Sequence, residues 1–333
     1  MYRRAPFLSS LLLLLIALLL SLAIGSVFIP PAELWRVITG TSSSEVFRTI
    51  FLDIRLPRTI LIAFVGAALA GSGAAYQGLF RNPLADPYLI GVAAGAGLGA
   101  IMAMSIHWPY NTLGLLAIPM AAFITGLLTV YIVYTIAHVG GSVPTTNLIL
   151  AGVAVSSFAV ALTSFLMFKS TNEVRRAIGW LLGGVSLVSW GATLALIPYL
   201  AIGLGTLILG GYALNLLQFG DDQATQMGLH VRRAKFIIIV AASLVTAAAV
   251  SFAGIIGFVG LIVPHIVRIW WGVDYRRLIP LSIIGGAVVL LFADVLARVV
   301  LAPQELPVGI VTALAGAPFF LWVLRRAKNQ GSW

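Results

Sequence analysis

The chain has 333 residues, of which 60% are hydrophobic and only 9% are charged, and its mean hydropathy is +1.06. Soluble domains carry about 25% charged residues, so this composition excludes an ordinary soluble protein and makes lipid the expected solvent. The absence of cysteine excludes disulfide scaffolds and thiolate chemistry, and the net charge of +10 suits an anionic membrane surface better than nucleic acid.

Apolar runs recur from one end of the chain to the other, and a bilayer span needs about 20 such residues. The first run follows the basic pair Arg3 and Arg4 and lacks the small-residue cleavage site of a secretory signal, so we expect a retained span that starts in the cytoplasm. Ten runs have the composition of spans: 7–29, 59–79, 88–106, 113–137, 147–168, 190–211, 236–256, 257–271, 278–297 and 307–324. The sequence therefore predicts an all-α integral membrane protein, one domain over residues 1–333, with about ten transmembrane helices and both termini cytoplasmic.

Two features qualify this topology. The run from 236 to 271 is interrupted only by three glycines, so its division is uncertain by a few residues. Twelve of the twenty basic residues fall on the expected inner side, in the direction of the positive-inside rule. The eight outer ones are Arg36, Arg48, Arg55, Arg58, Lys169, Arg175, Arg176 and Arg298.

Small residues at four-residue spacing indicate close helix packing. Gly91, Gly95 and Gly99 form one stripe, and Gly66 with Ala70 begins another. In lipid, such stripes let helix backbones approach each other. The first stripe lies inside an apolar run with no strand before it, so packing is favoured over a nucleotide-binding loop.

The sequence lacks the common motifs for nucleotide binding, metal binding and catalysis. No Gly-Lys pair exists for a phosphate-binding loop, the four histidines are scattered, and no serine elbow occurs, so we expect no catalytic residue and no metal site. An ion-coupled carrier would place ionisable residues near the midplane. The candidates are His265 and Asp294, but both fall near span ends, and Asp294 is spaced to pair with Arg298 on one helix.

The longest internal polar segment runs from about 215 to 235. Its centre predicts a short helix that Asp221 or Asp222 caps and Gly228 ends, with Ala224 and Met227 on an apolar face beside Leu217. A solvated loop with one helical turn is the plainer interpretation. A short amphipathic helix is also what docking into a soluble motor domain requires.

This segment, 214–229, resembles the coupling-helix loop of the iron-chelate and cobalamin permeases, the FecCD and BtuC-like membrane subunits of type II ABC importers. Further blocks agree in order along nearly the whole chain: Arg55-Leu56-Pro57-Arg58, Gly66 to Pro87, Leu150-Ala151-Gly152-Val153, Gly179-Trp180 with Gly183-Gly184, Ser251 to His265, Ala293-Asp294 with Arg298, Glu305 to Gly309, and Gly316 to Phe320.

The resemblance implies a permease in the bacterial cytoplasmic (inner) membrane. It would form a homodimer and work with two cytoplasmic ABC ATPase subunits and an extracytoplasmic substrate-binding protein, and it would not bind nucleic acid. The permease would hold no cofactor and would not be an enzyme, because ATP and Mg are used by the partner ATPase. The expected cargo is a bulky metal chelate, a ferric siderophore first and haem or cobalamin next. An ion-coupled secondary transporter that acts without an ATPase is the alternative.

The resemblance also implies roles for three groups of residues: contact with the ATPase, docking of the binding protein, and the cytoplasmic gate. The coupling-helix loop, at about 214–235, would contact the ATPase through Gly220, Asp221, Asp222, Ala224, Met227 and Gly228. The binding protein would dock on Arg55, Arg58 and Arg298, whose planar guanidinium groups suit carboxylates, although anchoring to lipid headgroups is the plainer account. The cytoplasmic gate would comprise Asn82, Leu84, Thr145 and Thr146, which also fit a plain turn and a helix cap.

Overall fold

A computed structural model describes residues 5–41, 44–106, 108, 112–140, 143–169, 174–185 and 189–329. Within these ranges the regular elements are helices, as expected. They are α1 (Ala5–Ala23), α2 (Pro31–Ile38), α3 (Glu45–Thr49), the π-helix η1 (Ile50–Arg55), α4 (Leu56–Leu79), the 3₁₀ helix η2 (Pro87–Ile90), α5 (Val92–Met104), α6 (Thr112–Ala137), α7 (Thr145–Lys169), α8 (Val174–Leu181), α9 (Trp190–Leu209), α10 (Gly211–Leu217), α11 (Asp221–Gln226), α12 (Val231–Ala253), α13 (Val259–Trp271), α14 (Tyr275–Val299) and α15 (Val308–Asn329).

Seven of the described helical segments are long and apolar enough to cross a bilayer. They contain α1, α4, α6, α7, α9, α12 and α14. Three shorter apolar helices, Val92–Met104, Val259–Trp271 and Val308–Val323, lie where the other three spans were expected. The all-helical membrane fold is therefore confirmed, whereas the count of ten spans and the side of each terminus remain predictions.

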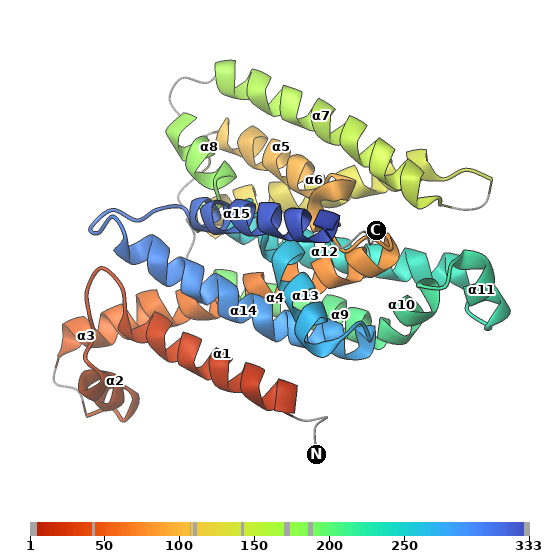
Figure 1. Ribbon diagram of the computed structural model, residues 1–333. Helices are drawn as coiled ribbons and strands as arrows, with labels where there is room; N and C mark the ends of the chain where they lie inside the picture. The colour runs from red at the N-terminus through yellow and green to blue at the C-terminus, as the bar shows by residue number, and fades with distance from the viewer. Residues whose placement is uncertain are drawn as a thin grey trace.

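Helix α4 lies at the centre of the molecule (Figure 1). It is buried along most of its length and packs against α14, α12, α13 and α9. Helices α5, α6 and α7 pack together on one side, and α1 lies on the opposite side against α14. The outward face of α1 exposes a row of leucines, as a lipid-facing helix does.

Glycines allow the central helices to touch. A Cβ atom on Gly66 of α4 would overlap the carbonyl oxygen of Gly286 on α14, and one on Gly73 would overlap that of Gly260 on α13. A Cβ on Gly95 of α5 would overlap Thr129 of α6. The prediction that the small-residue stripes serve helix packing is confirmed.

Several boundaries differ from the expected ones. The second span does not begin at 59, because α3, η1 and α4 form one continuous helical stretch over Glu45–Leu79. The ninth extends past 297, since α14 ends at Val299. The uncertain run from 236 to 271 breaks between Ala253 and Val259, where Phe258 adopts a positive φ of 69°.

The two ends of the bundle carry different short helices (Figure 1). Helices α2 and α3 lie at one end, and α10 with α11 lies at the other. Following the expected orientation, we call these the outer and inner ends. Local hydropathy did not indicate α2 and α3, whose small core of Ile29, Leu34, Val37 and Phe51 packs beside the start of α4.

Candidate functional site

At the outer end, one buried carboxylate holds two arginines. Arg58 of α4 donates from Nε and Nη2 to Oδ1 of Asp294 on α14, at 3.1 and 2.9 Å. Nε of Arg298 lies 3.0 Å from Oδ2 of the same carboxylate, so the expected helical pair between Asp294 and Arg298 is confirmed. The Asp294 side chain is fully buried. Both of its oxygens are therefore engaged by cations, as a buried charge requires.

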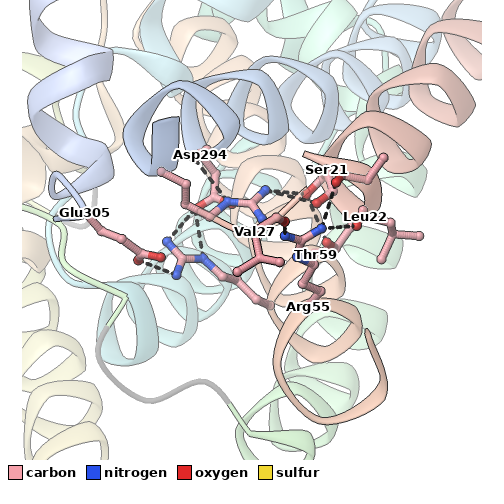
Figure 2. A network of polar contacts seen from close by, with 10 residues as sticks. Ser21, Leu22, Val27, Arg55, Thr59, Asp294 and Glu305 are labelled. Atoms are coloured by element: carbon pink, nitrogen blue, oxygen red, sulfur yellow. Dashed lines mark hydrogen bonds and ion pairs between the residues drawn. The ribbon is translucent and has the colours of Figure 1, made fainter. Parts of the chain in front are cut away.

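Arg55 and Arg298 fasten the end of α1. Arg55 donates from Nη1 to the carbonyl oxygens of Leu22 and Ala23, at 2.7 and 2.8 Å, and from Nη2 to that of Val27 (Figure 2). These include the last carbonyls of the helix, which have no partner within α1. Arg298 donates to the Oγ and carbonyl oxygen of Ser21 at 3.0 and 3.2 Å. A cation at a helix C-terminus also opposes the negative end of its dipole.

The structure thus brings the three predicted docking arginines together but buries two of them. Arg55 and Arg298 are each 4% exposed, whereas the Arg58 side chain is 12% exposed. The expected runs 59–79 and 278–297 leave the three arginines just outside the spans, but all three lie inside the helical segments Glu45–Leu79 and Tyr275–Val299. The docking role of the three arginines remains a prediction. Arg55 and Arg298 also have a structural role, because they hold the end of α1.

Glu305 adds a second acidic group that sequence reasoning left without a role. Its Oε2 lies 2.6 Å from Nη1 of Arg58, and its side chain is 42% exposed. The residue belongs to the loop between α14 and α15 and reaches the cluster from the edge (Figure 2). Since 247 positions separate it from Arg58, no local pattern could have indicated the pair.

At the inner end, the predicted short helix exists as α11, but it starts differently from the expectation. Gly220 occupies the N-cap position with φ 100°, and no side chain caps the helix. The proposed cap by Asp221 or Asp222 is therefore wrong, because Asp221 instead pairs with Lys235 on α12. Gly228, with φ 87°, follows the end of the helix as expected.

The apolar face of α11 divides between core and surface. Ala224 is fully buried, and Leu217 of α10 is 1% exposed. Met227 remains 47% exposed. The helix is therefore anchored by one apolar side chain and presents another at the inner end of the molecule.

Two amides connect this segment to the long helices. Asn215 donates to Oδ1 of Asp274 at 2.6 Å and accepts from the backbone N–H of Tyr275 at 2.9 Å, which joins α10 to the start of α14. Gln218 donates to the carbonyl oxygen of Gly78 at 2.9 Å, which joins the segment to the end of α4. Hydrogen bonds from Arg276 and Asn215 lower the pKa of Asp274 to about 2, so this carboxylate stays ionised.

A further polar link at the inner end was not indicated by the sequence. Gln77 of α4 is 1% exposed, donates to the carbonyl oxygen of Leu261 at 3.0 Å and accepts from Arg268 of α13 at 3.1 Å. Arg268 also donates to the Tyr275 hydroxyl at 3.3 Å. A polar Gln77 within an apolar run was the signal available for this link.

The predicted gate residues lie on neighbouring elements. Asn82 forms the turn after α4, where its Oδ1 accepts from Leu84 N–H at 2.9 Å. Thr145 and Thr146 are the first two residues of α7, so they do stand at a helix start. Gly152 of α7 packs against the η2 segment that follows the turn. The gate role of Asn82, Leu84, Thr145 and Thr146 remains a prediction.

Comparison with known proteins decides the family. The model of the FecCD transport family matches residues 13–326, nearly the whole chain. The chain belongs to the FecCD transport family. It is accordingly a multi-pass membrane permease of the ABC importer type.

Relatives of this FecCD permease cover most of its length. An uncharacterised ABC transporter permease of Bacillus subtilis, YvrB, is 38% identical over 99% of this chain and 96% of its own length. The cobalamin import permease BtuC of Halobacterium salinarum is 45% identical over 84% of this chain and 74% of its own. The hemin transport permease HmuU of Yersinia pestis is 40% identical over 96% of both.

Two solved structures share the fold of this chain. A chain of an ABC transporter assigned to the metal-chelate type, solved in an inward-facing conformation, has a TM-score of 0.83 and 29% identity and covers 98% of this FecCD permease and 99% of itself. PsaBC from Streptococcus pneumoniae shares the fold, with a TM-score of 0.55 and 21% identity over 86% of this chain and 94% of its own. Among the described residues, no group of three or more His, Cys, Asp or Glu could hold a metal ion.

Proposed function

We propose that this permease works as a homodimer with two cytoplasmic ATPase subunits and an extracytoplasmic binding protein, and imports a tetrapyrrole metal chelate by alternating access. The observation that carries the proposal is α11. This short helix stands at the inner end with Met227 exposed beside it, and the α10 segment that it packs against is tied to α14 through Asn215 and to α4 through Gln218. A rigid connection of this kind can transmit movement from a partner into the spans.

In this mechanism the ATPase subunits bind and hydrolyse ATP with Mg, and the permease performs no chemistry. Closure of the ATPase dimer would move α11, and the links to Gly78 and Asp274 would carry that movement into α4 and α14. The inner gate of Asn82, Leu84, Thr145 and Thr146 would open or close across the dimer axis. Short polar side chains suit a gate because they part without breaking strong bonds.

At the outer end, acidic groups of the binding protein would meet the positive cluster. Arg58 would make the direct contact, because it is the most exposed of the three arginines. Arg55 and Arg298 would add positive charge behind it. A guanidinium group remains charged and can bind a carboxylate with two parallel hydrogen bonds.

The cargo is proposed from the relatives. BtuC and HmuU are named as permeases for cobalamin and hemin, which supports a tetrapyrrole chelate over the ferric siderophore expected from family breadth. Both chelates are bulky and both contain a metal. The binding protein, rather than the permease, would select between them.

The deciding experiment is uptake into proteoliposomes that contain the permease with its ATPase and binding protein. We expect accumulation of cyanocobalamin or haemin that requires ATP, and less or none of a ferric siderophore. Uptake driven by a proton or sodium gradient without the ATPase would contradict the proposal and establish the ion-coupled alternative. Preferred uptake of the siderophore would overturn the cargo assignment alone.

A further inference from the structure

Arg58 is shared between two carboxylates that differ in exposure. Asp294 is fully buried and also pairs with Arg298. Moving its carboxylate away would therefore leave both Arg58 and Arg298 without their acidic partner. Glu305 is 42% exposed and contacts Arg58 through a single ion pair of 2.6 Å. One carboxylate is therefore a fixed partner of Arg58, and the other can exchange with water at small cost.

The loop fold places Glu305 at this position. The backbone N–H of Leu306 donates to the carbonyl oxygen of Ala297 at 2.9 Å, which turns the loop back onto the end of α14. Val308 then donates to the carbonyl oxygen of Gly183 at 3.2 Å and is fully buried. The backbone beside Glu305 is thus held, while its side chain lies at the exposed edge of the cluster (Figure 2).

The charge of the cluster changes with the position of Glu305. The cluster contains three guanidinium groups and two carboxylates, so one positive charge remains when Glu305 is paired. When Glu305 turns into solvent, a second positive charge is uncovered at Arg58. An incoming carboxylate can then take the place of Glu305 and neutralise this charge at Arg58 again.

We propose that Glu305 is an exchangeable internal carboxylate that occupies the Arg58 guanidinium until an acidic group of the docking protein displaces it. Glu305 would lower the affinity for partners with few acidic groups and keep Arg58 neutralised when no partner is bound. It would therefore tune docking without being a docking residue itself. This inference rests on the proposed function, because it requires a binding protein that docks at the outer end.

The test is docking of an extracytoplasmic substrate-binding protein of the same organism to the permease–ATPase complex in nanodiscs, measured by surface plasmon resonance. We expect Glu305→Gln to bind about fivefold more tightly, because an exposed competing ion pair is removed. Glu45→Gln is the matched control, since Glu45 is exposed on α3 and its loss changes the net charge equally. The control should bind as the unmodified complex does.

The possible failures are distinguishable. If the unmodified complex binds no such protein, the proposed function fails and the inference falls with it. If it binds but Glu305→Gln binds equally or more weakly, only the inference is overturned. An equal gain in both variants would show a general charge effect instead. Loss of assembly in Glu305→Gln would also overturn the inference, because the carboxylate would then be a structural partner.

Discussion

Arg58 and Asp294 lie on two different central helices, and the Arg58 guanidinium donates two hydrogen bonds to one oxygen of the Asp294 carboxylate. The other oxygen faces Arg298, which in turn holds the end of α1 through Ser21. A single buried acid therefore connects α1, α4 and α14 at the outer end. The docking surface proposed for the permease is built on this structural joint.

Asp294→Asn should destabilise the permease strongly. The amide cannot neutralise Arg58 and Arg298, and removing one partner of a buried ion pair costs about 3–5 kcal/mol. We expect a lower melting temperature of the detergent-solubilised protein by differential scanning fluorimetry. Asp53→Asn is the control, because Asp53 is exposed on η1. Equal melting temperatures for the two variants would show that Asp294 does not hold the joint.

Gly286→Ala should disrupt the contact between α4 and α14. The added methyl group would overlap the carbonyl oxygen of Gly66 and the side chain of Ala70. Overpacking of this kind costs about 1–3 kcal/mol and more where backbone must move. Gly205→Ala on α9 is the control, since nothing lies within 4 Å of a Cβ there. Yield and melting temperature measure the effect, and an unchanged Gly286→Ala protein would contradict the close approach.

Met227→Arg should uncouple ATP hydrolysis from uptake while the complex still assembles. Met227 is 47% exposed beside α11, so a bulky cation there would alter the contact with the ATPase without disturbing the core. We expect the ratio of substrate imported to ATP hydrolysed to fall about tenfold or more, because closure of the ATPase would no longer move the spans. Met227→Leu should retain the ratio. Normal uptake by the arginine variant would remove α11 from the coupling role.

Burial of Asp86 should make the stability of the folded permease depend on pH. Burial raises the pKa of Asp86 to about 6, although the Tyr88 N–H that donates to it at 2.8 Å opposes the shift. The unfolded chain has an ordinary pKa of about 3.9, so the folded state binds the proton more tightly. The contribution of this proton to stability is present below the unfolded value and is lost as pH rises through about 6.

Asp86→Asn should therefore melt at a higher temperature than the unmodified protein at about pH 8, because the buried charge is removed while an oxygen remains to cap η2. The difference should shrink as the pH falls below about 6. Thermal melts of both proteins across this range measure it. A difference that is constant with pH would mean that Asp86 is not the titrating group.

The hydropathy pattern anticipated the helices better than the site. The long segments α6, α7 and α9 match the expected runs closely, because the cost of unpaired backbone in lipid forces an apolar run into a helix wherever it lies. The expected start at 59 misses α3 and η1, because charged residues such as Asp53 and Arg55 lower the hydropathy of that part of the helical stretch. Local sequence predicts Asp221 as a cap of α11, but its partner is Lys235 of α12, which no local pattern indicates.

The sequence by itself determined that this protein is embedded in a membrane and that its helices pack through small-residue stripes. It also showed that a polar segment near 215–235 interrupts the apolar runs. These properties are local, because hydropathy and residue size act over a single turn or span. Only the tertiary structure decided that Arg55 caps α1 and that Arg58 is shared by Asp294 and Glu305. Those partners lie 32, 33, 236 and 247 positions apart along the chain, and charges so distant in sequence are matched only when the helices have packed.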